Sequence, residues 1–155
     1  MKKNVIAAIV FLTLFVALVV TLLLRPTQQE MLGLEPATTI LMPTQTDCDA
    51  RGKSCAATLG QYRLNIKIGE TVKTLQPFSL SIEADGWHPQ QLAVYFSMVG
   101  MEMGLNRFRL QQTGNLWQGQ AMLPLCTQQR NDWLATVFVT HNGERYRAEF
   151  GFSTQ

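Results

Sequence analysis

Apolar and polar residues alternate with a period of two from Cys55 onward, and this pattern limits the possible fold more than any other feature of the chain. It is clearest where Tyr62, Leu64, Ile66 and Ile68 are separated by polar residues. A period of two places successive side chains on opposite faces of a strand. Similar segments cover residues 55–59, 78–84, 92–98, 108–110, 116–122, 133–139 and 146–152. Seven or eight short strands without an amphipathic helix predict an all-β fold, an antiparallel β-sandwich of immunoglobulin-like or cupredoxin-like type.

Turn signals between these segments indicate which loops lie together. The Asn-Gly pair at 142–143 is the strongest hairpin signal in the chain. Successive loops of an antiparallel sandwich mostly alternate between its two ends. We therefore expect the loops at 98–106 and 123–132 at one end. The turn at 142–143 is expected at the other end, together with His88 and His141.

A run of 20 residues near the N-terminus, 5–24, is apolar apart from Thr13 and Thr21. A transmembrane helix needs about 20 such residues. A cleaved signal peptide would have an apolar core of about 7–15 residues followed by small residues. Here the run is longer, no small-x-small site follows it, and no cysteine is present there to carry a lipid. We therefore expect an uncleaved transmembrane helix.

The charged residues beside this helix predict its orientation in the membrane. Lys2 and Lys3 precede it, and positive residues favour the cytoplasmic side, so the C-terminal part is expected outside the cytoplasm. Without these lysines, the remaining 11 basic residues balance the 11 acidic ones. The exported part has no basic run, so nucleic acid is not expected as a partner. The expected organisation is a cytoplasmic tail at 1–4, a transmembrane helix at 5–24, a linker at 25–46 and an exported β-sandwich domain at 47–155.

Three cysteines in an exported domain indicate an oxidising compartment and at most one internal disulfide. Cys48 and Cys55 enclose a short loop that contains Gly52, and we expect this pair to be bridged. Cys126 then keeps a free thiol. A Cys55–Cys126 contact competes with this assignment, because Cys55 would begin its strand at the end of the sandwich that carries Cys126.

Three of the seven methionines fall within six residues. In an extended segment, Met101 and Met103 point the same way and Glu102 points the other way. Gly100 and Gly104 allow the backbone to bend around the two sulfurs. Thioethers suit Cu(I), whereas methionine also commonly fills the edge of a core. The residues alone leave both interpretations open.

Further residues expected at the same end complete a candidate soft-metal set. Met98 keeps the phase of the strand before it and is expected in the core. For Met122, packing is also favoured over metal binding. Cys126 is either a ligand or a small buried hydrophobe. Asn106 and Arg107 close the loop, and Arg107 either supports loop carbonyls or a loop carboxylate or is a solvated charge.

Three stretches carry a resemblance to a known family. They are Met-Val-Gly-Met-Glu-Met-Gly-Leu-Asn-Arg at 98–107, Leu-Trp-Gln-Gly at 116–119 and Met-Leu-Pro-Leu-Cys at 122–126. The chain resembles the membrane-anchored FixH/YtkA-like proteins over about residues 60–152 and in its anchor. The resemblance implies one N-terminal transmembrane helix, a small exported β-sandwich with methionines in a loop, and a link to copper handling and the assembly of haem–copper respiratory oxidases. It implies Met101 and Met103 as the family's methionines.

The expected function is therefore non-enzymatic. No Gly-x-Ser-x-Gly, Cys-x-x-Cys, phosphate-binding glycine loop or zinc-type histidine cluster is present. The leading hypothesis is a bacterial inner-membrane protein with a periplasmic domain that binds Cu(I) and assists a respiratory oxidase or another copper-delivery protein. A second hypothesis is a metal-free module that docks on a membrane protein complex through its methionine loop. Thiol exchange is a third, weakened by the absence of Cys-x-x-Cys.

Overall fold

The computed structural model describes residues 15, 38–104, 106–128 and 130–155. The predicted tail at 1–4, the predicted transmembrane helix at 5–24 apart from Phe15, and the predicted linker up to residue 37 lie outside this description. No helix of membrane-spanning length and hydropathy occurs among the described residues. The chain divides into two compact units, Met1–Glu35 and Pro36–Gln155, and every described strand belongs to the second.

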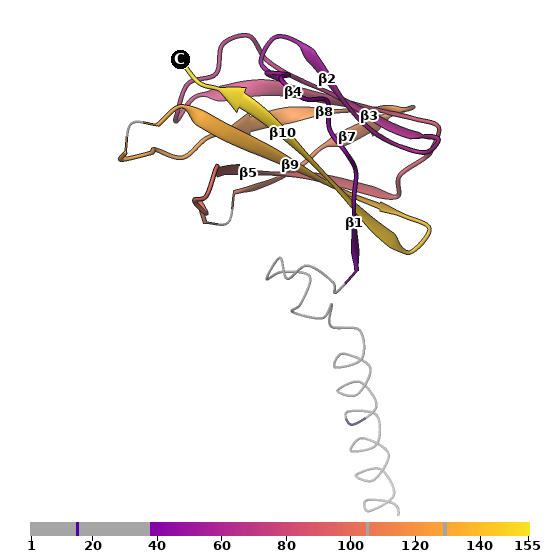
Figure 1. The fold of residues 1–155 in the computed structure, drawn as a ribbon. Helices are drawn as coiled ribbons and strands as arrows, with labels where there is room; N and C mark the ends of the chain where they lie inside the picture. Colours follow the sequence, from indigo (N-terminus) through magenta and orange to yellow (C-terminus); the bar gives the residue numbers. More distant parts are fainter. Residues whose placement is uncertain (1–14, 16–37, 105, 129) are drawn as a thin grey trace, which may run out of the picture. The chain divides into compact units, whose positions relative to one another are not determined.

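Ten strands form two five-stranded sheets (Figure 1). The strands are β1 Thr39–Leu41, β2 Ser54–Leu59, β3 Tyr62–Ile68, β4 Pro77–Asp85, β5 Gln91–Met98, β6 Arg107–Arg109, β7 Gln111–Thr113, β8 Leu116–Met122, β9 Asp132–His141 and β10 Glu144–Ser153. Sheet A has the order β1-β10-β9-β5-β6 and sheet B the order β2-β3-β4-β8-β7. All neighbours are antiparallel except β1 and β10. The predicted all-β sandwich is confirmed at this level.

The core lies between the sheets and follows the sequence alternation. On β3, Leu64, Ile66 and Ile68 are fully buried while Arg63 and Lys67 are exposed. The same pattern recurs on β4 and β10, whereas β5, an interior strand of sheet A between β9 and β6, is buried on nearly every residue. Alternation was therefore the correct signal for the eight strands that it predicted.

One side of the sandwich is closed by a segment that was predicted to be linker. β1 pairs with β10 in sheet A, and Met42 N donates to Arg147 O at 2.8 Å. The chain then passes to sheet B, where Gln45 N donates to Ala56 O at 2.8 Å. The predicted linker at 25–46 therefore runs too far, and the domain begins before residue 47. A three-residue strand followed by Pro43 shows no sustained alternation, which is why the pattern missed it.

The other side is closed in the same way between β6 and β7. β6 pairs with β5 in sheet A, β7 pairs with β8 in sheet B, and the buried Leu110 lies at the change of sheet. A Cβ on Gly119 would lie only 2.7 Å from Leu110 Cδ2. The glycine in β8 therefore leaves room for the side chain of Leu110 in its present position.

The loops gather at two ends, as the alternation rule predicted. We call one the methionine end; among the described residues it is formed by 69–76, 99–104, 106, 123–128, 130 and 131. The other is the hairpin end, formed by the turns at residues 60–61, 86–90, 114–115 and 142–143. His88 and His141 lie together at the hairpin end, with His141 Nδ1 3.1 Å from His88 O. In Figure 1 the methionine end is on the left and the hairpin end on the right.

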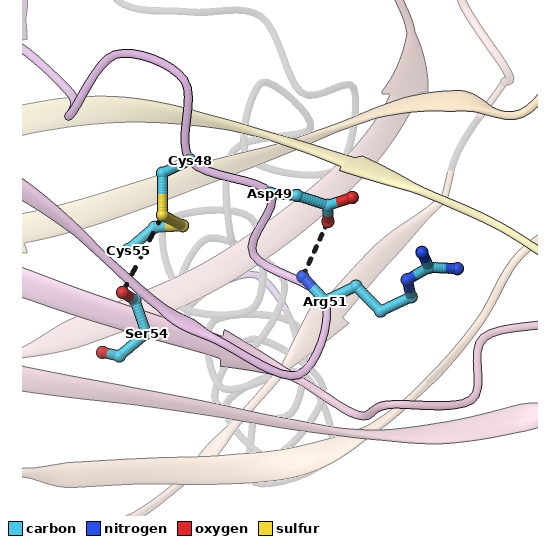
Figure 2. Close-up of a disulfide and its surroundings, with 5 residues drawn as sticks. All are labelled: Cys48, Asp49, Arg51, Ser54 and Cys55. Atoms are coloured by element: carbon cyan, nitrogen blue, oxygen red, sulfur yellow. Dashed lines mark hydrogen bonds between the residues drawn. A yellow bond between two sulfur atoms is a disulfide. The ribbon is translucent and has the colours of Figure 1, made fainter.

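Cys48 and Cys55 form the predicted disulfide, and Cys126 is free (Figure 2). The competing prediction of a Cys55–Cys126 contact is therefore wrong. Within the disulfide loop, the buried Ala50 connects the two sheets. Its N–H donates to Gly151 O of β10 at 3.0 Å, and its carbonyl accepts from Ile68 N of β3 at 2.9 Å.

Asp49 fixes this disulfide loop through its carboxylate. One oxygen accepts from Arg51 N at 2.9 Å, as Figure 2 shows, and the other accepts from Ser153 Oγ at 2.5 Å. Burial alone would raise the pKa of Asp49, but the hydrogen bonds from Ser153 and Arg51 outweigh it, so the pKa is lowered. The ionised carboxylate therefore holds the loop against the end of β10.

Candidate functional site

The methionine loop leaves β5 through a tight turn. Met98 N donates to Met101 O at 3.0 Å, and Met101 N donates to Met98 O at 2.9 Å. The turn residue Gly100 has a φ of +73°, a conformation that favours glycine. Gly104, with a φ of +72°, makes the second bend. The predicted glycine bends on either side of Met101 and Met103 are therefore present.

Tyr95 attaches the far part of this loop to sheet A. Its hydroxyl oxygen lies 2.7 Å from both Glu102 Oε2 and Gly104 O. A phenol has one proton, so it donates to one of these acceptors at a time. Burial, followed by the hydrogen bond to Glu102, raises the pKa of Tyr95 to about 12, so the phenol stays protonated at neutral pH. Support of Glu102 by Arg107 was one of the alternatives that the sequence left open, and nothing in the sequence pattern indicated Tyr95 as a partner of Glu102.

We expect Tyr95→Phe to loosen the methionine loop while costing the whole domain only about 1 kcal/mol of unfolding free energy. The substitution removes the hydroxyl and keeps the ring. Amide hydrogen exchange should become faster at residues 99–104. Tyr146→Phe is the matched control, because Tyr146 donates to Glu144 at 2.6 Å at the hairpin end. Faster exchange at 99–104 in both variants would contradict a local role for Tyr95.

Arg130 joins the cysteine-bearing loop to the methionine loop. Its Nη2 donates to Val99 O at 2.9 Å, and its Nε donates to Asp132 Oδ1 at 2.9 Å within an ion pair. The hydrogen bond to Asp132 raises the pKa of Arg130, and the nearby Cys126 adds to this. The two loops predicted to share one end are therefore in direct contact.

The five predicted ligand residues separate into three groups. Met98 is 1% exposed and pairs with Trp133, so it is a core residue, as its phase indicated. Met122 is 47% exposed and lies between the inward-facing Ala121 and Leu123, so it points out of sheet B. The expectation that Met122 packs in the core was therefore wrong. Because its side chain points away from the core, Met122 is also removed from the set of candidate ligands. The residues that remain are Met101, Met103 and Cys126, all half-buried and packed against the core.

Asn106 ends the methionine loop and is 8% exposed. Its N–H donates to Gly104 O at 2.9 Å, and its carbonyl accepts from Phe96 N at 3.1 Å. The side-chain Nδ2 is buried and has no hydrogen-bond partner within the described part of the chain. It was predicted only as a loop-closing residue. Arg107, the other loop-closing candidate, is exposed and lies opposite Tyr95 in the β5–β6 pairing.

The donor set at this end consists of two thioethers and one thiol. Among described residues, no group of three or more His, Cys, Asp or Glu is placed to hold a metal ion. Thioether and thiolate sulfur are soft ligands, which suit Cu(I) and match Mg²⁺ or Ca²⁺ poorly. The chemistry of Met101, Met103 and Cys126 therefore fits Cu(I).

Exposed apolar side chains also occur in or next to the loops of the methionine end. Of the large exposed hydrophobic residues described in the β domain, all but Leu41 lie at the methionine end. We call this set the apolar rim; its members are Leu75, Val99, Met122 and Leu125. Leu75 has a φ of +60°, which is uncommon for a residue other than glycine, and its N–H donates to Leu123 O at 2.9 Å. Leu75 is therefore held exposed in a conformation that costs backbone strain.

The fold and this end define a two-sheet all-β domain whose methionine end carries two half-buried thioethers, one free thiol and several exposed apolar residues. The chain matches no protein-family model, no curated protein and no solved structure.

Proposed function

We propose that this protein is a membrane-anchored periplasmic accessory protein that binds Cu(I) at the methionine end and assists the metallation or assembly of a respiratory oxidase. One observation carries the proposal. The Cys48–Cys55 disulfide leaves Cys126 as a free thiol, in a loop that Arg130 joins to the methionine loop through Val99 O. The resemblance to FixH/YtkA-like proteins supports the inner-membrane location and the oxidase partner.

In this proposal the residues have separate roles. Met101 and Met103 supply uncharged thioethers, and Cys126 supplies a thiolate after losing its proton to solvent. Gly100 and Gly104 shape the loop, and Tyr95 and Arg130 hold it in place. A site of this composition selects Cu(I) over Zn²⁺, because zinc sites in proteins use thiolate, imidazole and carboxylate ligands rather than thioethers. The sandwich carrying it is expected to be of cupredoxin-like or immunoglobulin-like type.

We expect the full chain to bind one Cu(I) per molecule. The measurement is a Cu(I) titration against a competing chelator in the presence of ascorbate, with metal analysis of the isolated complex. Zn²⁺ in the same assay is expected to bind much more weakly. A chain with a demonstrably reduced Cys126 that retains no Cu(I) would overturn the proposal.

The apolar rim favours a second candidate function, a metal-free module that docks on a membrane protein complex. Four exposed apolar residues in or next to the three loops of one end are the kind of side chains that mediate protein contacts. Leu75→Asn with Leu125→Asn removes two of these side chains, and asparagine tolerates the positive φ of Leu75. If the parent binds no Cu(I) but co-purifies with a haem–copper oxidase, and this variant does not co-purify, the docking function replaces the copper function.

A further inference from the structure

The end of β10 and the two residues after it pair with two loops of the methionine end. We call residues 153–155 the strap. Thr154 N donates to Asn131 O at 3.0 Å, and Gln155 N donates to Val72 O at 3.2 Å. Asn131 lies in the cysteine-bearing loop, and Val72 lies in the loop between β3 and β4. The strap therefore connects these two loops to each other.

The disulfide loop, residues 48–55, holds the strap from the other side. Ser153 Oγ donates to Asp49 Oδ2 at 2.5 Å, and Ala50 N donates to Gly151 O, two residues earlier in β10, at 3.0 Å. Both bonds come from residues inside the ring that the disulfide closes. Because a closed ring has few conformations, these bonds to β10 are made at a low entropic cost. The disulfide therefore helps to keep the strap in place.

Contacts continue from the strap to the methionine loop. Asn131, which accepts from Thr154, follows Arg130 in the chain, and Arg130 Nη2 donates to Val99 O at 2.9 Å. Each link between the disulfide loop and the methionine loop is a hydrogen bond or a connection along the chain. Release of the strap therefore removes support from the loops of the methionine end.

We propose that the Cys48–Cys55 disulfide is a redox-sensitive latch, which on reduction by a dithiol releases the strap and loosens the methionine end. Cys48 is half-buried and Cys55 is 1% exposed, so a thiolate of the dithiol attacks Cys48 Sγ. A mixed disulfide forms at Cys48, and Cys55 leaves as a thiolate that takes up a proton. The second thiol of the dithiol then displaces Cys48, so the dithiol becomes a disulfide and both cysteines become thiols. The purpose of the latch rests on the proposed copper function, but its operation requires no metal.

Reduction of the metal-free full chain tests the latch. All three cysteines lie in the described part of the chain and one pair is bridged, so dithiothreitol has one disulfide to reduce. We expect amide hydrogen exchange at the strap, at 72–76 and at 99–104 to become roughly 5-fold faster, the factor that corresponds to loss of one hydrogen bond. Gln90 N, which donates to Thr140 O at 2.9 Å at the hairpin end, is the internal control and should exchange at an unchanged rate.

Two variants separate the disulfide from the strap. Cys48→Ala with Cys55→Ala removes the bridge without adding thiols and should reproduce the effect of reduction. Ser153→Ala keeps the bridge and removes the side-chain bond to Asp49. It should already accelerate exchange at 99–104 in the oxidised chain. Reduction should then add less than in the parent, because the two changes act through the same contact.

Ser81→Ala is the matched control for Ser153→Ala. Ser81 Oγ donates to Lys67 O at 3.5 Å in sheet B, away from the strap. This variant should respond to reduction as the parent does.

The outcomes separate the latch from the proposed function. Faster exchange confined to residues 48–55 after reduction overturns the latch. Equal acceleration at Gln90 also overturns it, because reduction then weakens the whole domain. The full parental effect of reduction in Ser153→Ala overturns it as well, because the strap then carries no coupling. Since these measurements use no metal, a chain that exchanges as expected but binds no Cu(I) keeps the latch and loses the copper function.

Discussion

Replacing Met101 and Met103 together by leucine is expected to weaken Cu(I) binding by at least about 100-fold, or about 2.8 kcal/mol. Leucine roughly conserves volume, so each substitution should cost less than about 1.5 kcal/mol of unfolding free energy. Only the thioether sulfurs are lost, and a single thiolate at Cys126 remains. Competition titration with Cu(I) gives the affinity, and urea unfolding confirms that the variant is folded.

Met122→Leu is the matched control for this double variant. Met122 lies at the same end but points out of sheet B and is exposed, so its sulfur should contribute nothing to the affinity. A double variant that folds and binds Cu(I) like the parent would exclude Met101 and Met103 as ligands. If such a variant also loses its partner, the methionine loop is a docking surface.

Gly86→Ala is expected to destabilise the domain by about 4 kcal/mol or more, or to prevent folding. Gly86 has a φ of +83°, and a Cβ there would lie 2.2 Å from the backbone oxygen of Gln61. A backbone atom in a hairpin cannot move aside as the end of a side chain can. The next residue, Trp87, is buried and donates from Nε1 to Arg63 O at 3.2 Å, so any shift of the turn disturbs the core.

Gly143→Ala isolates the contribution of the clash. Gly143 has a nearly equal φ of +80°, but a Cβ there meets no atom within 4 Å. Alanine should therefore cost only the conformational term of about 1–2 kcal/mol. Thermal or urea unfolding of both variants gives the difference. Equal losses of stability in the two variants would show that the contact with Gln61 O does not contribute to the effect of Gly86→Ala.

Much of this fold could be predicted from local pattern. Alternation located eight strands, and the short Gly52-containing loop identified the Cys48–Cys55 disulfide. β7 was missed because its three residues are all polar and exposed. β1 was missed because three residues before a proline have no period, and its partner β10 is about a hundred positions away in the chain. Strand pairing over such a separation leaves no local signal.

The candidate site was only partly predictable, for a similar reason. Loop alternation correctly brought the methionine and cysteine loops to one end. The alternation on β8 places Trp117, Gly119 and Ala121 on one face of the strand. It therefore places Met122 on the opposite face, so the outward direction of Met122 is predictable from the sequence. The bond from Tyr95 to Glu102 and the buried amide of Asn106 depend on side-chain placement, which spacing alone does not determine.

The two segments that change from one sheet to the other limit how this domain can move. Residues 39–45 and 107–113 join the two sheets along opposite sides of the sandwich. The sheets therefore cannot separate along either of these sides. If Met101, Met103 and Cys126 bind an ion as proposed, access to these half-buried side chains would depend on the end loops and not on separation of the sheets. Loop motions take nanoseconds to microseconds, whereas collective domain opening takes microseconds to milliseconds. Exchange of metal with a partner would then be limited by ligand replacement at the sulfurs rather than by opening of the protein.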